Sequence, residues 1–232
     1  MTLLLDGVRE AIGLLVGGGD GEIWSILWLS LQVSGSATLI SLLLGVPAGT
    51  ALALTRFPGR GLVVSAVNSG MGLPPVVVGL FVTILLWRSG PLGALEILYT
   101  PAAIVVAQAV IAAPIVTGIT LAAVQQVPRE FRLQLLALGA SRVQMVWVVL
   151  REARLPMLAA VMAGFGGVIS EIGASMMVGG NIKGQTRTLT TAMVLETSKG
   201  DFDVAIALSL LLLVLVFLVN WALTSIQQRR AS

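Results

Sequence analysis

The residues best placed to do chemistry lie in one stretch of the chain, "GVISEIGASMMVGGNIKGQT" at 167–186. Glu171 is the one charged residue between Arg154 and Lys183, inside a run of small and apolar residues. A carboxylate is expensive to bury within a membrane, so Glu171 is a functional candidate there. The alternative is a structural role, since a carboxylate can accept hydrogen bonds from hydroxyl or backbone groups or pair with an Arg.

Cations and hydroxyl groups follow this stretch. Lys183, Thr186, Arg187 and Thr188 offer the positive charge and hydrogen-bond donors that bind an oxyanion arriving from outside. The alternative is a solvated loop of mixed charge. The Gly-Gly-Asn at 179–181 is typical of the end of a helix, and we expect a helix to stop there.

The composition excludes most kinds of catalytic site. The chain has no His and no Cys, which removes thiol chemistry, haem ligation and nearly all zinc sites. Only one acid lies inside the apolar segments, so a membrane-embedded enzyme would lack a nucleophile and base or a metal cluster. The 232 residues are 56% hydrophobic and 11% charged, whereas soluble domains contain about 25% charged residues. We therefore predict a membrane protein with no catalytic and no metal-ligating residues.

Five segments are long and apolar enough to cross a bilayer. They run over about 23–54, 62–87, 101–124, 155–178 and 204–226, and "GLPPVVVG" interrupts the second. The expected fold is an all-α polytopic membrane protein with five transmembrane helices, formed by residues 23–228.

Residues 1–22 are predicted to be an amphipathic segment at the membrane surface. The apolar positions 4, 5, 8, 12 and 15 fall on one face of a helix. Asp6, Arg9 and Glu10 make a sixth span costly, and a Gly-rich break follows at 17–21.

The charges predict an orientation in the membrane. The ends of the first, third and fifth spans lie on one side, together with nine of the fourteen Lys and Arg residues and two acids, Glu130 and Glu152. The other side carries five basic residues and eight acids. Because cytoplasmic loops are enriched in Lys and Arg, we expect the N-terminus outside and the C-terminus in the cytoplasm, in the cytoplasmic (inner) membrane.

The longest polar stretch is the predicted cytoplasmic segment at 125–156. A helical pattern at 133–138, the Gly-marked turn "LGASR" at 138–142 and a second helix at 143–150 predict a helix-turn-helix. An apolar stripe with an Arg-rich rim is typical of a docking surface. An ordinary surface loop between spans is the alternative.

The same stretch resembles a known family. "LALGASRVQMVW" is similar to the cytoplasmic coupling loop of ABC importer permeases, with Gly139, Ala140, Ser141 and Arg142 matching the pattern. Leu133 stands where the family usually has Glu, and Pro156 lies about one helical turn (~4 residues) further on than the usual closing Pro. The resemblance implies the type I permease fold and a loop that binds an ATPase subunit, with Leu135 and Leu138 beside the four matching residues.

Two further stretches resemble the oxyanion branch of this family. "LPPVVVGL" at 73–80 is similar to its Pro-Pro segment, and "SEIGASMMVGGNIKGQTRTLTTAM" is similar to the helix and loop of molybdate, tungstate and sulfate permeases. The "SEIGASMM" version looks most like the tungstate permeases. The likeness covers roughly residues 25–228.

What the resemblance implies is a transport subunit rather than an enzyme. Two copies would form the pathway, two ATP-binding subunits would dock on 125–156, and a separate extracytoplasmic protein would deliver the anion. ATP and Mg would be bound by the ATPase, so no cofactor is expected in this chain, and no nucleic-acid partner. Tungstate is the expected anion, with molybdate or sulfate as alternatives. A passive channel is the alternative from another class, and it would not need the docking loop.

Residues that could line the pathway or its gate are polar, small or conformationally special. A recurrence of small residues at 163, 167, 170 and 174 places them on one helical face, which suits either a close helix contact or a pathway. Glu171 would repel a dianion, so a bracing or gating role is expected for it rather than substrate contact. The candidates are Asn68, Pro74, Pro75, Ser170, Glu171, Gly173, Ser175, Met176 and Asn181.

Overall fold

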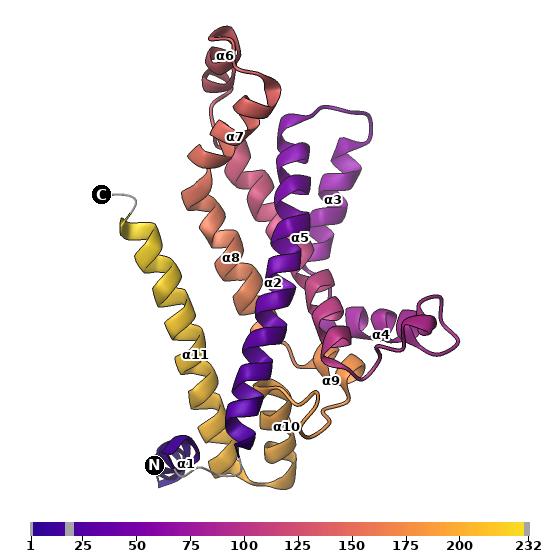
Figure 1. Cartoon of the computed structure of the whole chain (residues 1–232), viewed down its shortest axis with the longest axis vertical. Coiled ribbons are helices and arrows are strands. Elements are labelled where there is room, and N and C mark those ends of the chain that lie inside the picture. The colour runs from indigo at the N-terminus through magenta and orange to yellow at the C-terminus, as the bar shows by residue number, and fades with distance from the viewer. Residues whose placement is uncertain (1, 17–20, 230–232) are drawn as a thin grey trace.

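The structure is a computed structural model that describes residues 2–16 and 21–229. All regular structure within these residues is helical, and Figure 1 shows the arrangement. The elements are α1 (Thr2–Val16), α2 (Glu22–Leu54), α3 (Arg60–Met71), α4 (Pro75–Leu86), η1 (Gly93–Leu95), α5 (Pro101–Gln125), α6 (Arg129–Ala137), α7 (Arg142–Glu152), α8 (Arg154–Ile169), α9 (Gly173–Gly179), α10 (Leu189–Lys199) and α11 (Phe202–Arg229).

Each of the five expected spans has a helical counterpart, but two of these counterparts are bent pairs of helices. Among the described residues, three helices are long and apolar enough to cross a membrane, and the number becomes five if each of two bent pairs counts as one span. The pair α3 and α4 bends by 103°, and the pair α8 and α9 bends by 59°. The predicted interruption of the second span is thus present, whereas the break in the fourth span was not predicted.

The larger bend follows from "GLPP". A Pro disfavours helical geometry in the residue before it, and Pro74 precedes Pro75. Pro74 accordingly has an extended backbone, with a ψ of 122°. A helix restarts at Pro75, where a missing N–H costs nothing because the first N–H groups of a helix are unpaired. In Figure 1, α4 accordingly lies across the direction of α2 and α5.

The centre of the molecule is the contact between α2 and α5. A Cβ at Gly45 would stand 2.8 Å from Val116 Cγ1, and a Cβ at Gly49 would stand 2.5 Å from the carbonyl oxygen of Thr117. The backbones thus approach more closely than larger residues would allow, as is usual where small residues line helix contacts in membranes. Ser41 adds a bond between the helices by donating to the Ala109 carbonyl at 3.1 Å.

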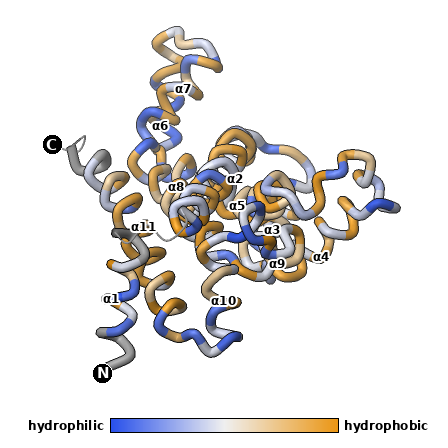
Figure 2. Tube along the Cα trace, turned by 60° about the horizontal axis from the view of Figure 1, so that its bottom comes forward, coloured by the Kyte–Doolittle hydropathy of each residue, from blue (hydrophilic) through white to orange (hydrophobic). Residues whose placement is uncertain are grey.

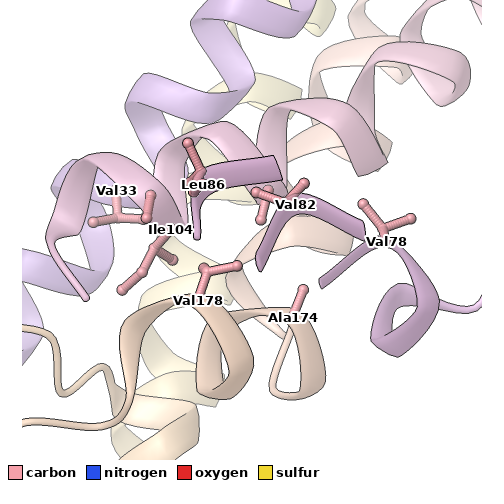
Figure 3. Close-up of a cluster of buried hydrophobic side chains, with 9 residues drawn as sticks. Val33, Val78, Val82, Leu86, Ile104, Ala174 and Val178 are labelled. Atoms are coloured by element: carbon pink, nitrogen blue, oxygen red, sulfur yellow. The ribbon is translucent and has the colours of Figure 1, made fainter. Parts of the chain in front are cut away.

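A second packing centre lies where α4 and α9 meet these two helices. Val78 and Val82 of α4 face Ala174 and Val178 of α9, with Ile104 of α5 and Val33 of α2 beside them (Figure 3). The short helices that follow the two bends are thus held against the long ones by a shared apolar cluster.

The two ends of the molecule differ in composition. The α6–α7 hairpin and the turn between α2 and α3 lie at one end, and α1 and α10 lie at the other (Figure 1). Figure 2 shows hydrophilic residues in α6 and in the turns, and mainly apolar residues along the long helices. We call the end with the α6–α7 hairpin the basic end, because the Arg-rich segments of the sequence meet there.

Helix α1 packs against α11 through its small residues. Gly7 stands directly against Ile206, and Ala11 is buried. Val8 and Ile12, from the predicted apolar stripe, are instead 44% and 58% exposed, as expected of a surface available to lipid. Residues 17–20 of the Gly-rich break predicted at 17–21 lie outside the described residues, as does Arg230.

The α2–α5 contact gives a prediction about stability. Gly49→Ala should lower the free energy of unfolding by about 1–3 kcal/mol, because the added methyl meets backbone atoms that cannot move aside. Thermal unfolding of the purified chain in detergent measures this change.

The matched control is Gly35→Ala in the same helix, where a Cβ would meet nothing within 4 Å. Ala is the better helix former by roughly 0.5–1 kcal/mol, so this variant should be no less stable than the wild type. Equal destabilisation by both substitutions would contradict the proposed role of Gly49.

Candidate functional site

Glu171 lies in the break between α8 and α9, and both its side chain and its backbone are used there. Its Oε1 accepts a hydrogen bond from the backbone N–H of Ala174 at 3.0 Å. Its carbonyl oxygen accepts from the Thr190 hydroxyl, also at 3.0 Å. The carboxylate thus caps the start of α9, and α10 holds the other side of the break. This is the structural arrangement that the sequence left open as one of two roles.

The Thr-rich segment after α9 is tied down by its own hydroxyl groups. Thr186 is buried, and its hydroxyl donates to the Gly179 carbonyl and accepts from the Ile182 N–H. Thr188 is also buried and forms a capping box with Thr191 at the start of α10. In this structure these two hydroxyls hold the loop together, and the role expected for them towards an anion stays a prediction.

Lys183 and Arg187 share one carboxylate, that of Glu22 at the start of α2. The distances are 2.7 Å from Lys183 Nζ to Glu22 Oε2 and 3.3 Å from Arg187 Nη1 to Glu22 Oε1. The three side chains leave a net charge of +1, with Lys183 69% exposed and Arg187 only 16%. The cations predicted to face an anion therefore fasten the loop to α2, and Lys183 is the more accessible of the two.

The predicted helix stop at Gly-Gly-Asn is confirmed. Helix α9 ends at Gly179, and Gly180 and Asn181 both have left-handed backbones, with φ of 71° and 50°. Asn181 also donates from Nδ2 to the Thr191 carbonyl at 3.3 Å, so it links the turn to α10.

The remaining pathway candidates divide into an exposed and a covered set. Asn68, Pro74 and Ser170 are exposed, whereas Ser175 is 1% exposed. Pro75 and Met176 are half-buried, and Gly173 packs so closely on Val76 that a side chain would not fit. The candidates therefore differ in exposure within one chain, and their common role in a pathway stays a prediction.

The predicted face of small residues is interrupted. Ala163, Gly167 and Ser170 are exposed along α8, but Ala174 follows the 59° bend and is fully buried. The first three form one exposed stripe, and Ala174 belongs to the packing of α9.

Gln108 lies outside the candidate set but contacts one of its members. Its Nε2 donates to the Ser175 hydroxyl at 3.2 Å, which joins α5 to α9 in the buried core. The one feature of the sequence that could have pointed to Gln108 is that it is a lone polar residue within a predicted span. Within the residues that the structure describes, no three His, Cys, Asp or Glu side chains gather as a metal site.

The α6–α7 hairpin has the helix-turn-helix form predicted for it. Gly139 has a φ of 88°, which favours Gly, and the Ala140 N–H donates to the Leu135 carbonyl at 3.0 Å. Ser141 begins the next helix with a capping box that includes Gln144, and Arg142 is its first residue.

The outer surface of this hairpin is apolar and exposed. Leu138, Val143 and Trp147 are 85%, 79% and 61% exposed, and together with the turn they line an open pocket. Arg151 lies 5.5 Å from the centre of the Trp147 ring. Val149 is fully buried against α5, so the hairpin is anchored on one side and open on the other.

Comparison with known proteins identifies the family. Residues 42–232 match the family described as binding-protein-dependent transport system inner membrane component. The chain belongs to this family. It is therefore a subunit of a membrane transport system, with helices that are apolar enough to cross a membrane.

Individual relatives are consistent with this family. A probable anion ABC transporter permease protein of Haloferax volcanii is 43% identical over 84% of this chain and 87% of its own length. The tungstate uptake system permease protein TupB of Peptoclostridium acidaminophilum is 38% identical over 98% of this chain and all of its own. The expected resemblance to ABC importer permeases is thus confirmed.

A solved structure confirms the permease fold. An inward-facing conformation of the MetNI methionine ABC transporter aligns with a TM-score of 0.74 at 23% identity, over 89% of this chain and 96% of that one. The two broken spans are therefore part of an ABC importer permease fold.

The contacts of Glu171 give a prediction about the break. Glu171→Ala should lower the free energy of unfolding by about 1 kcal/mol, the effect of removing a helix cap, whereas Glu171→Gln keeps an oxygen that can accept from Ala174. Thermal unfolding in detergent compares the two variants. Glu130→Ala, which removes an exposed carboxylate on α6, is the control and should change little. If Glu171→Gln is as unstable as Glu171→Ala, the cap does not explain the role of Glu171.

Proposed function

We propose that this permease is the transmembrane subunit of an ATP-driven importer of a tetrahedral oxyanion, with tungstate as its substrate. The main support for an ATP-driven importer is the α6–α7 hairpin, which exposes an apolar surface at the basic end of the chain. The support for tungstate is that one relative is a tungstate uptake permease. A passive pore has no use for such a surface. The anion permease among the relatives supports the same class of substrate.

The assembly that this function requires contains two copies of the chain and separate partners. The exposed stripe of Ala163, Gly167 and Ser170 on α8 is a surface from which two copies can enclose a pathway. Two ATPase subunits bind the two α6–α7 hairpins and carry ATP and Mg, so this chain needs no nucleotide site. An extracytoplasmic binding protein delivers the anion at the opposite end.

The orientation follows from charge. The basic end, with the α6–α7 hairpin and the Arg56–Arg60 turn, lies in the cytoplasm, and α1 and α10 lie outside. The N-terminus is then outside and the C-terminus inside the cell.

The charges near the outer end suit an anion that passes without being held tightly. Lys183 is exposed beside Glu22, and Lys183, Arg187 and Glu22 together carry a net charge of +1. This is a weak local attraction for a dianion on a side of the chain where acids outnumber bases. Glu171 keeps its carboxylate turned to the backbone of α9, where it braces the break without contacting the anion. Tungstate and molybdate carry the same charge, so the choice between them falls to the binding protein.

The hairpin turn provides a test of the ATP-driven mechanism. Gly139→Val should abolish ATP-driven tungstate uptake, because a β-branched residue with left-handed φ strains the turn by about 1–2 kcal/mol and displaces the exposed Leu138. Uptake is measured in proteoliposomes that contain this chain, its ATPase and its binding protein. A passive channel would keep its conductance in the same variant.

The matched control is Gly200→Val at the opposite end. Gly200 has a φ of 86°, against 88° for Gly139, and a Cβ at either position would meet nothing within 4 Å. The backbone strain is therefore the same, and only the hairpin variant should lose ATPase binding. Equal loss of uptake in both variants would contradict a docking role for the hairpin.

A further inference from the structure

A shallow groove near the basic end combines apolar walls with a single cation. It holds about 170 Å³ between α2, the end of α7 and the start of α8. The residues that carry the argument are Leu42, Val46, Leu150, Arg154, Leu158 and Val161. None of them belongs to the exposed hairpin surface or to the small-residue stripe already described.

The walls of the groove lie on membrane-spanning helices. Leu42 and Val46 are one turn apart on α2, and Leu158 and Val161 are nearly one turn apart on α8. All four are half-buried, so an apolar surface remains uncovered in one chain. On helices of this length and hydropathy, such a surface suits a hydrocarbon chain better than a polar ligand.

Arg154 supplies the charge at the mouth of the groove. It is the first residue of α8 and is exposed, and it forms no ion pair within the part of the chain that the structure describes. The neighbouring Arg151 is instead stacked on Trp147. An unpaired guanidinium above an apolar groove matches a ligand with a phosphate group and a hydrocarbon chain.

We propose that this groove binds an anionic phospholipid, with its phosphate on Arg154 and an acyl chain along α2 and α8. The leaflet that supplies this lipid is inferred from the orientation proposed above. That orientation places Arg154 at the cytoplasmic leaflet, where anionic lipids are concentrated. A second copy of this chain is expected instead on the small-residue stripe of Ala163, Gly167 and Ser170, and none of these three residues lines the groove.

The site has a structural consequence for the hairpin. Leu150, at the end of α7, lines the groove and also packs against the buried cluster that contains Val149 and Val124. A bound acyl chain therefore contacts the hinge between the hairpin and the spans. Anionic lipid stabilises the position of the hairpin relative to α2 and α8.

Lipid binding can be tested on the full-length chain without measuring transport. Purified protein in neutral detergent is titrated with phosphatidylglycerol or with phosphatidylcholine of the same acyl chains, and bound lipid is counted by native mass spectrometry. The wild type should prefer phosphatidylglycerol. Arg154→Gln should weaken phosphatidylglycerol binding about fivefold, the effect of one basic side chain at a membrane surface, and leave phosphatidylcholine binding unchanged.

Two further variants show whether lipid binding depends on the positive charge at position 154 or on the total charge of the chain. Arg154→Lys keeps the charge and should retain most of the preference, whereas Arg129→Gln removes a charge from exposed α6 and should leave binding as in the wild type. Equal binding of the two lipids by the wild type, or equal loss in Arg154→Gln and Arg129→Gln, would overturn the proposal. Inorganic phosphate that displaces the lipid at equal concentration would also overturn it, in favour of a free-anion site. Because transport is not measured, failure here leaves the proposed import function untouched.

Discussion

The close contact between α2 and α5 is the constraint on which the other helices depend. Gly45 and Gly49 let the two backbones approach, and α5 in turn carries α3, α8 and α9 on its other sides. In a bilayer there is little hydrophobic driving force between helices, so packing of small residues and inter-helix hydrogen bonds must hold the bundle. The Ser41–Ala109 bond and the Gln108–Ser175 bond are of this kind.

The breaks between α3 and α4 and between α8 and α9 are possible because the helices around them are held in place by the α2–α5 contact. A break within a membrane exposes backbone groups that need partners, and the structure supplies them from nearby side chains. At the second break, the Glu171 carboxylate caps α9 and Thr190 donates to the Glu171 carbonyl. The loop beyond α9 is fastened in the same way, by Thr186 on the Gly179 carbonyl and by Glu22 on Lys183 and Arg187. Residues that suggested anion binding thus hold together the end of the molecule opposite the α6–α7 hairpin.

Turns and helix ends could be predicted from the sequence, because each depends on a few neighbouring residues. Gly139 and Ser141 determine the hairpin turn through backbone φ and a capping box, and Gly180 ends α9 for a similar reason. The Pro-Pro segment predicted an interruption but not the 103° bend, which depends on the packing of α4 against α9. The pairing of Glu22 with Arg187 joins residues 165 positions apart, and neither sequence spacing nor periodicity contains that information.

In the proposed importer, ATP is used at one end of the molecule and the anion enters at the other, with the break between α8 and α9 in between. The central claim is that transport of the oxyanion is driven by ATP through a separate ATPase. The most direct measurement is accumulation of tungstate in vesicles that contain this chain, with its ATPase and binding protein present or left out. The account predicts accumulation only with ATP and both partners. Uptake that persisted without ATP and without the ATPase would contradict it.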